Sequence, residues 1–307
     1  PGARLANLVA DIENGTVADL NQLNTRLDQI RALYAEDEWS WVKAAYQKLT
    51  GVNVDSANPQ DLAGVADTLL ANRTEFLEAV LGEVMDIFPS PHIHIGGDEA
   101  PKDRWRECPA CQQRMRDENL KSEEELQAYM IRRCGELLRS KGRRVIGWEE
   151  VLNGTPSTDT VVQWWRHRTH GDHALRTALA RGHSAISSPN SFCYLSFPVT
   201  PDKHFRPERT SDLRKVYSAE LVPNDIPAEQ RARFLGAECC VWTEWLTHKD
   251  IFPMLFPRAL AATELMWSDP QQRDYDTFLS RIQEARAFWK SMGVEYGPYS
   301  SGEAEAQ

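Results

Sequence analysis

Residues 91–101, Pro-His-Ile-His-Ile-Gly-Gly-Asp-Glu-Ala-Pro, place two adjacent carboxylic acids after a short strand-like run. Isoleucine and histidine alternate over residues 92–95, which is the period-two pattern of a β-strand. The two glycines that follow have no Cβ, so a ligand or another backbone can approach closely there. Asp98 and Glu99 would repel each other at the end of such a strand. This repulsion favours one ionised and one protonated acid, as acid catalysis requires. The alternative is that the pair only caps the next helix.

The elements that must position these acids alternate between strand and helix after Glu75. Alternation of this kind implies a parallel sheet with right-handed helical crossovers. Informative residues stand at the C-terminal ends of the strands, the face on which (β/α)₈ barrels carry their active sites. We therefore expect an α/β fold of the TIM-barrel type with about five strand-helix units. The expected strands are 92–97, 143–148, 160–165, 184–195 and 235–243, and the main expected helices are 76–88, 123–138, 175–181, 257–267 and 275–292.

Residues 1–75 instead show the three-to-four spacing of amphipathic helices and carry no catalytic cluster. We therefore predict two parts, a helical segment of unknown role at 1–75 and a barrel portion at 76–307. Five parallel strands alone would leave two open edges, which parallel sheets normally cover. The helical segment or a second copy of the chain would have to cover them, so a homo-oligomer is one possible state.

Bulk properties exclude several classes of partner. The 307 residues carry a net charge of −10, which argues against nucleic acid and anionic membranes, and no apolar run approaches the length of a membrane span. The chain begins at proline rather than methionine, so we expect a trimmed N-terminus whose targeting signal is unseen. Cys108 and Cys111 have half the spacing of a zinc site, but no second pair follows. A local disulfide or two plain thiols is the expected alternative, and we expect no metal or other cofactor.

His-Ile-Gly-Gly-Asp-Glu, ending at Glu99, resembles the catalytic signature of family-20 glycoside hydrolases, the β-N-acetylhexosaminidases. Further segments resemble that family in the same order: Gly-Trp-Glu-Glu at 147–150, Gln-Trp-Trp-Arg at 163–166, Trp-Thr-Glu at 242–244 and the helix at 257–267. The resemblance covers about residues 76–289. It implies an eight-stranded barrel in which the acid pair ends the fourth strand, so three earlier units should precede His92. Either the first 75 residues contain unrecognised strands or a helical unit replaces them, and we favour replacement.

The resemblance implies hydrolysis of terminal non-reducing N-acetyl-D-hexosamine residues by a retaining, substrate-assisted mechanism. In this family the 2-acetamido oxygen of the substrate is the nucleophile, so no enzyme carboxylate attacks the sugar. By the same resemblance Glu99 is the general acid, and Asp98 orients the acetamido group and stabilises the developing charge. The partner would be a glycan or oligosaccharide that contains N-acetylhexosamine. Relatives are usually secreted, periplasmic or lysosomal, so an extracytoplasmic location is expected.

The resemblance also implies a substrate pocket built mainly from aromatic side chains. Trp148, Trp165 and Trp242 would form its walls, because flat indole faces suit a methyl group and a sugar ring. Tyr194 would donate its hydroxyl to the acetamido oxygen, and Glu244 would accept hydrogen bonds from the outer hydroxyls of the sugar. Each tryptophan could instead be a core residue.

Several neighbouring residues carry a different expectation. Trp164 should point away from Trp165 and pack in the core, and the two glutamates after Trp148 should position a loop. His94 is either a partner of the site or a satisfied core histidine, and we favour the core. Ser196 stands where the family commonly has aspartate, so the grip on one sugar hydroxyl should be weaker.

Three functional hypotheses follow from these observations. The first is a β-N-acetylhexosaminidase. The second is a non-catalytic binding or structural protein with a remnant sugar pocket, because the first barrel strands are not recognisable. The third is an ordinary retaining glycosidase that uses Glu99 and Glu244 as acid and nucleophile. The first and third differ in whether turnover needs the 2-acetamido group, and the second predicts no turnover.

Overall fold

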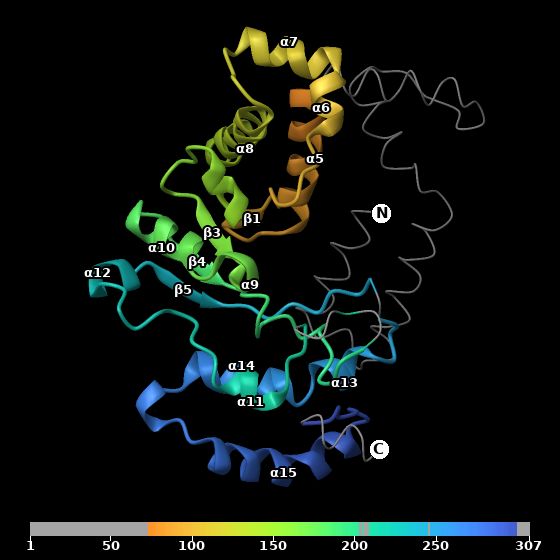
Figure 1. The fold of residues 1–307 in the computed structure, drawn as a ribbon. Helices are drawn as coiled ribbons and strands as arrows, with labels where there is room; N and C mark the ends of the chain where they lie inside the picture. The colour runs from red at the N-terminus through yellow and green to blue at the C-terminus, as the bar shows by residue number, and fades with distance from the viewer. Residues whose placement is uncertain (1–72, 203–204, 206–208, 245, 300–307) are drawn as a thin grey trace, which may run out of the picture. The chain divides into compact units, whose positions relative to one another are not determined.

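A computed structural model describes residues 73–202, 205, 209–244 and 246–299 (Figure 1). The helical segment expected at 1–75 lies outside the described residues except for its last three, which begin helix α5 (Arg73–Ile87), and the division at residue 75 stays a prediction. Within the described residues the chain forms two compact units. One contains 73–93, 102–126 and 132–144, and the other contains 94–101, 127–131 and 145–299.

The strands form one five-stranded sheet whose spatial order, β1-β2-β3-β4-β5, follows the chain. Parallel pairing runs from β2 to β5, with Trp148 opposite Gln163, Trp164 opposite Ser187, and Ser187 opposite Ala237. This arrangement confirms the expected α/β fold with about five strand-helix units. The strands are β1 (His92–His94), β2 (Arg144–Trp148), β3 (Val161–Trp164), β4 (Ala185–Ser187) and β5 (Phe234–Ala237).

The core lies around β3, all of whose residues are buried. A continuously buried strand is typical of a parallel sheet that is covered on both faces. Helix α10 (His173–Ala180) returns from β3 to β4 and buries Leu175, Ala178 and Leu179 in this core. Short helical segments η1 (Glu149–Asn153) and α9 (His167–His170) follow β2 and β3.

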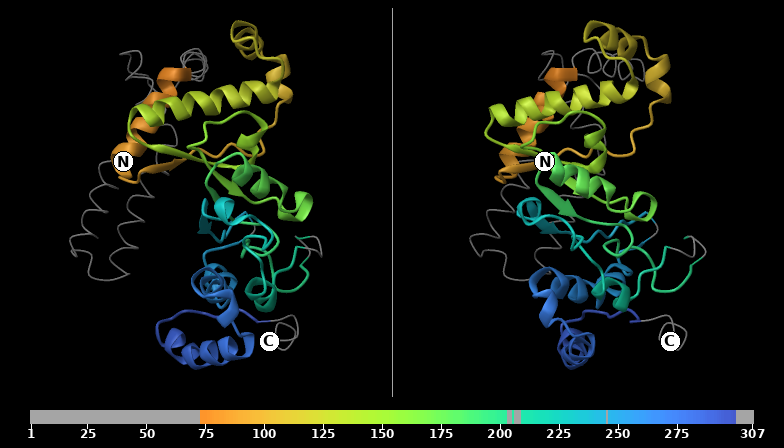
Figure 2. Two further views of the ribbon diagram at one scale, coloured as in Figure 1. Left: turned by 90° about the vertical axis from the view of Figure 1, so that its left-hand side faces the viewer. Right: turned by 60° about the vertical axis from the view of Figure 1, so that its left-hand side comes forward.

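A second cluster lies among the C-terminal helices α11 (Leu213–Tyr217), α14 (Arg258–Trp267) and α15 (Tyr275–Ser291). Figures 1 and 2 show α14 beside α11, with α15 on the side of α14 away from the sheet. The remaining elements here are α12 (Ala228–Arg231), α13 (Ile251–Leu255) and η2 (Pro270–Gln272).

The other unit contains α5 (Arg73–Ile87), α6 (Asp103–Glu107), α7 (Pro109–Asp117) and most of α8 (Glu123–Ser140). The Cys108 sulfur caps α7 by accepting the Cys111 backbone N–H at 3.4 Å. Cys111 is itself buried against Met115 and Leu126. In this structure the two cysteines therefore act as a helix cap and a core residue.

Several expected boundaries were wrong. The strand expected at 184–195 ends at Ser187, because Pro189 has no N–H to continue a ladder and the chain turns, with Cys193 N–H bonded to the Pro189 carbonyl at 2.8 Å. The strand expected at 235–243 ends at Ala237, and the one at 92–97 ends at His94. Helices α6 and α7 lie between the strand expected at 92–97 and the helix expected at 123–138, where no helix was predicted.

No helix in the described parts of the chain combines the length and apolar character needed to cross a membrane.

Candidate active site

The acid pair follows β1, and the backbone of this turn has unusual dihedral angles. Gly96 and Gly97 have φ of +73° and +98°, and Glu99 has φ of +44°. A Cβ on Gly97 would lie 3.0 Å from Val151 Cγ1, so this glycine is needed for both conformation and space. A left-handed non-glycine residue costs on the order of 1 kcal/mol or more and is enriched at functional sites. The local backbone thus holds Glu99 in a strained position at the end of β1.

The end of β2 approaches the same turn closely. A Cβ on Gly147 would lie 2.5 Å from Val151 Cγ1 and 3.2 Å from the Gly96 carbonyl oxygen, so no larger residue fits without movement. The Trp148 backbone N–H donates to the Gly96 carbonyl at 2.9 Å. Glycine at 147 therefore lets Trp148 sit next to the loop that carries the two acids.

Two buried carboxylates hold Trp165 at the end of β3. Glu149 accepts the Trp165 backbone N–H at 2.9 Å and the Arg166 Nε–H at 2.6 Å. Glu150 accepts the Trp165 indole N–H at 3.0 Å. Trp164 points into the core, where it is 1% exposed. These contacts match the expectation that the glutamates position the loop and that Trp164 packs in the core.

Tyr194 and Trp242, from the segments after β4 and β5, lie beside Trp165 and Trp148. A single parallel bridge pairs Tyr194 with Cys240, which keeps the two segments adjacent beyond the ends of the regular strands. The Tyr194 and Trp165 rings are stacked at 5°, with centroids 6.2 Å apart. Trp242 lies 6.2 Å from Trp148 and 6.0 Å from Tyr194, again between centroids. The four rings form one connected group.

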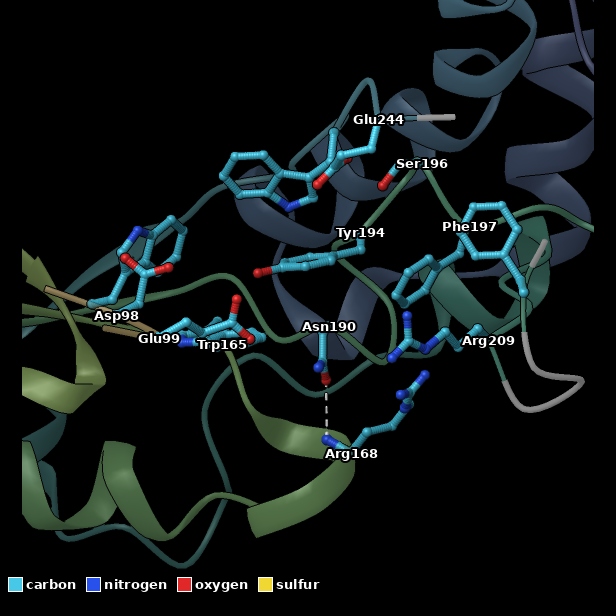
Figure 3. A pocket seen from close by; sticks show the side chains of 13 residues that line it. Asp98, Glu99, Trp165, Arg168, Asn190, Tyr194, Ser196, Phe197, Arg209 and Glu244 are labelled. Carbon is cyan, nitrogen blue, oxygen red and sulfur yellow. Dashed lines mark hydrogen bonds between the residues drawn. The ribbon is translucent and has the colours of Figure 1, made fainter. Parts of the chain in front are cut away.

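This aromatic group and the two acids line a cavity of about 280 Å³ (Figure 3). All seven residues singled out in the sequence contribute to it: Asp98, Glu99, Trp148, Trp165, Tyr194, Trp242 and Glu244. The Tyr194 hydroxyl points toward the side on which Asp98 and Glu99 lie (Figure 3). The volume of this cavity is near the lower end of the range for small-molecule sites. Acids that face flat aromatic walls suit one sugar ring whose glycosidic oxygen needs a proton.

Tyr194 is held in its protonated form. Burial raises the pKa of Tyr194 well above its usual value, and the charges of Asp98 and Glu99 add to the increase, whereas a hydrogen bond with the Trp242 side chain opposes it. The hydroxyl therefore remains a hydrogen-bond donor at neutral pH.

His94 is a correction to the sequence interpretation. The residue as a whole is exposed rather than in the core, but its ring is partly shielded and lies edge-on to Trp148, with centroids 5.2 Å apart. Nδ1 accepts the Gly96 backbone N–H at 3.0 Å. Desolvation of the ring lowers the pKa of His94, with Glu238, Gln163 and Asp98 acting in the opposite direction. His94 therefore supports the turn and Trp148 as a neutral acceptor.

Sequence reasoning missed five residues that line the cavity: Arg168, Asn190, Phe197, Phe205 and Arg209. Arg168 lies in the four-residue helix α9 and the other four lie in loops, and none of these segments has a hydrophobic period or a recognisable motif. Ser196, noted only as a departure from the family, also lines the cavity, and its side chain is buried. The Asn190 side-chain oxygen accepts the Arg168 backbone N–H at 3.0 Å, which ties α9 to the loop after β4. Within the described residues, no group of three or more histidine, cysteine, aspartate or glutamate side chains could hold a metal.

One buried arginine fixes the loop that carries Tyr194 and Ser196. The Arg258 guanidinium donates to the carbonyls of Leu195, Phe197 and Ser211 at 2.6–2.7 Å, and also to that of Met254. Burial lowers the pKa of Arg258 to about 10. The group thus stays charged at neutral pH and anchors the pocket wall to the start of α14.

Comparison with known proteins agrees with this geometry. The model of the glycosyl hydrolase family 20 catalytic domain matches residues 34–270, so the similarity begins earlier than the motifs indicated. The chain is 34% identical over 225 residues to a beta-hexosaminidase of Porphyromonas gingivalis, covering 72% of this chain and 28% of that protein. A beta-hexosaminidase of Vibrio furnissii is 33% identical over 209 residues, covering 64% and 33%.

Solved structures show the same relation. The beta-N-acetylhexosaminidase of Bacteroides fragilis superposes with a TM-score of 0.69 at 34% identity, over 75% of this chain and 46% of that one. An exo beta-N-acetylglucosaminidase of Vibrio harveyi, solved in complex with N-acetylglucosamine, gives a TM-score of 0.65 at 31% identity, over 73% and 35%. The chain therefore spans less than half the length of these relatives.

Proposed function

Because the chain belongs to glycosyl hydrolase family 20, we propose that it hydrolyses terminal non-reducing N-acetyl-D-hexosamine residues of β-N-acetylhexosaminides. This proposal rests on the observation that Asp98, Glu99, Tyr194 and three tryptophans line one and the same cavity. Its relatives are named beta-hexosaminidases, and one was solved with N-acetylglucosamine bound. The substrate class is therefore an N-acetylhexosamine-containing glycan or oligosaccharide.

The proposed mechanism is retaining and substrate-assisted. Glu99 donates its proton to the glycosidic oxygen as the bond from that oxygen to C1 breaks. The acetamido oxygen of the same sugar attacks C1 from the opposite face, which gives a cyclic oxazolinium. Water then attacks C1 and gives a proton to the Glu99 carboxylate, and the acetamido group reforms. Two inversions at C1 leave the β configuration unchanged.

The remaining residues act on the acetamido group and the ring. Asp98 accepts the acetamido N–H and stabilises the positive charge of the intermediate. Tyr194, kept protonated by its surroundings, donates to the acetamido oxygen and aims it at C1. Trp148, Trp165 and Trp242 surround the methyl group and exclude water, and Glu244 accepts from the outer hydroxyls.

The test compares an aryl β-N-acetylglucosaminide with the matching aryl β-glucoside. Turnover of the first and at least a 100-fold lower kcat/KM on the second are expected, because the glucoside has no acetamido nucleophile. Comparable turnover of both would instead support a protein carboxylate as nucleophile, with Glu99 and Glu244 as the pair. No turnover of either by folded protein would support a non-catalytic sugar-binding pocket.

A further inference from the structure

Two cysteines lie opposite each other beside the bridge that joins the segments after β4 and β5. The Cys240 N–H donates to the Cys193 carbonyl and the Leu195 N–H donates to the Cys240 carbonyl, each at 2.8 Å, which makes the parallel bridge between Tyr194 and Cys240. One residue earlier in the same register, Cys193 stands opposite Cys239. Successive side chains of extended backbone point to opposite faces. Cys193 and Cys239 therefore share the face that Tyr194 and Cys240 do not use.

The packing of the four side chains agrees with this alternation. Tyr194 and Cys240 pack together with Trp165 on the cavity side. Cys193 is 2% exposed in the core around β3, and Cys239 is half-buried against the same core. A hydrogen bond joins the Cys193 and Cys239 side chains, and both are thiols in this structure. Neighbouring strands lie about 4.8 Å apart, which is within the range of about 4.4–6.8 Å between Cα atoms that a disulfide spans.

The two thiols are not equivalent. The hydrogen bond with Cys193 lowers the pKa of Cys239, and the charge of Arg258 acts in the same direction, whereas burial and Glu238 oppose it. The same hydrogen bond, together with burial, raises the pKa of Cys193. Because the thiolate is the nucleophile in thiol chemistry, the more exposed Cys239 is the attacking group. Cys193, buried beside it, is placed to react second.

The neighbouring Cys240 is set apart from this pair. Its side chain is on the other face, with its sulfur 4.0 Å from a carboxylate oxygen of Glu238. Burial, with Glu238 acting in the same direction, raises the pKa of Cys240 to about 12. Cys240 therefore stays a thiol at neutral pH and supplies an internal control for the other two.

We propose that Cys193 and Cys239 form a modification site that reacts with a low-molecular-weight disulfide and closes into a disulfide of their own. The Cys239 thiolate attacks one sulfur of the external disulfide, whose S–S bond breaks and releases one thiolate. The Cys193 thiol then loses its proton, and its sulfur attacks the Cys239 sulfur and displaces the second thiolate. Two cysteine thiols are thus oxidised, the external disulfide is reduced to two thiols, and the released thiolates take up the two protons. The new bond joins the segments that carry Tyr194 and Trp242, and its formation does not depend on the proposed hydrolysis.

The experiment incubates the folded full chain with glutathione disulfide, quenches with acid, alkylates the remaining thiols and maps the peptides by mass spectrometry. One disulfide between Cys193 and Cys239 is expected, and dithiothreitol should reverse it. Cys239→Ser should leave Cys193 reduced, whereas Cys193→Ser should stop at a mixed disulfide of glutathione with Cys239. Cys240→Ser, the matched control from the other face, should still form the bond. A disulfide that uses Cys240, or wild-type protein in which both Cys193 and Cys239 stay reduced, would overturn the inference.

Thermal unfolding of the wild-type chain gives a second readout that needs no variant. The oxidised form should have a Tm about 5 °C or more above that of the reduced form, because the bond restricts the unfolded chain. Dithiothreitol should abolish the difference, and glutathione disulfide should produce no such increase in Cys193→Ser. An oxidised form that unfolds at the same or a lower temperature would contradict a bond that fits the native register.

Discussion

Glu99 combines a strained backbone with a place at the rim of an aromatic cavity. Its φ of +44° is one that side chains rarely adopt, and the two preceding glycines with positive φ lead the chain into it. The carboxyl group consequently faces a site rather than continuing β1. Backbone strain at a catalytic acid is expected where the placement of its carboxyl group matters more than local stability.

Glu99→Gln should therefore affect substrates unequally. Protonation of the leaving oxygen contributes about 100-fold or more when that oxygen is a poor leaving group, and little when it is already acidic. We expect kcat to fall at least 100-fold on an N-acetylhexosamine disaccharide and less than tenfold on a 2,4-dinitrophenyl glycoside. Glu107→Gln, at an exposed position on α6, is the matched control. Equal losses on the two substrates would assign Glu99 another role.

Glu150, whose carboxylate accepts the Trp165 indole N–H, should make the stability of the fold depend on pH. Burial raises its pKa, while the Trp165 indole N–H and the Arg166 charge oppose the increase. Between the unfolded pKa of about 4.3 and the raised folded value, the folded chain retains a proton that the unfolded chain has released. Stability conferred by this group is therefore present below that window and lost as pH rises through it.

Glu150→Gln removes this titration but keeps an oxygen that can accept from Trp165. The free energy of unfolding of the variant should rise relative to wild type as pH increases from about 4 to about 7. Urea denaturation across that range measures the difference, with the exposed Glu229→Gln as control. Parallel pH profiles for wild type and Glu150→Gln would show that burial does not perturb this carboxyl group.

Among the elements, α14 reaches the pocket wall through its first residue, Arg258, which donates to the carbonyls on both sides of Ser196. Removal of its side chain leaves four backbone carbonyls without their donor, and a buried acceptor without a partner costs about 1–3 kcal/mol. Arg258→Met should therefore lower the free energy of unfolding by about 3 kcal/mol or more. Arg258→Lys should restore only part of it, because one ammonium group cannot reach carbonyls on several sides. Arg116→Met on α7 is the control for loss of charge.

Chemical denaturation followed by tryptophan fluorescence would measure these differences, since the indoles of the pocket lie close to the anchored loop. Wild-type stability in Arg258→Met would contradict an anchoring role. Lost sugar affinity in a stable Arg258→Lys variant would show that the loop position itself matters to the site.

The sequence predicted elements well where one face is apolar over several turns or a strand is wholly buried. β3 was recognisable because Val161, Val162 and Trp164 are interrupted only by Gln163, and α8 because its apolar positions repeat. The four- and five-residue helices α11, α12 and α13 are too short to show any period. α7 buries only Cys111 and Met115, so its pattern is weak.

The site residues also divide into those that stand in recognisable sequence patterns and those placed by tertiary contacts. Asp98, Glu99 and the tryptophans stand at or near strand ends inside recognisable motifs, so the sequence could indicate them. Arg168 lies in the four-residue helix α9 and Arg209 in a loop. The course of both segments is set by tertiary contacts with Asn190, Phe197 and Arg258. The strand assigned to residues 184–195 is interrupted for this reason too, since the chain turns after Ser187 and pairs again with the segment after β5 only at the Tyr194–Cys240 bridge.

On the scale of the whole molecule, the chain matches family 20 over residues 34–270 and yet spans less than half of the relatives compared. The segments that follow its described strands place two acids, three tryptophans and a tyrosine around one cavity. Our central claim is that this pocket recognises the cyclised, positively charged intermediate of substrate-assisted hydrolysis.

Calorimetry with a thiazoline analogue of the cyclic intermediate and with N-acetylglucosamine tests this claim most directly. A site complementary to the reacting state should bind the thiazoline at least about 100-fold more tightly than the sugar. Asp98→Asn should weaken thiazoline binding more than sugar binding, because the lost charge faces the cation, whereas Trp242→Ala should weaken both. Equal affinity for the two ligands, or binding of neither by a folded chain, would contradict the claim.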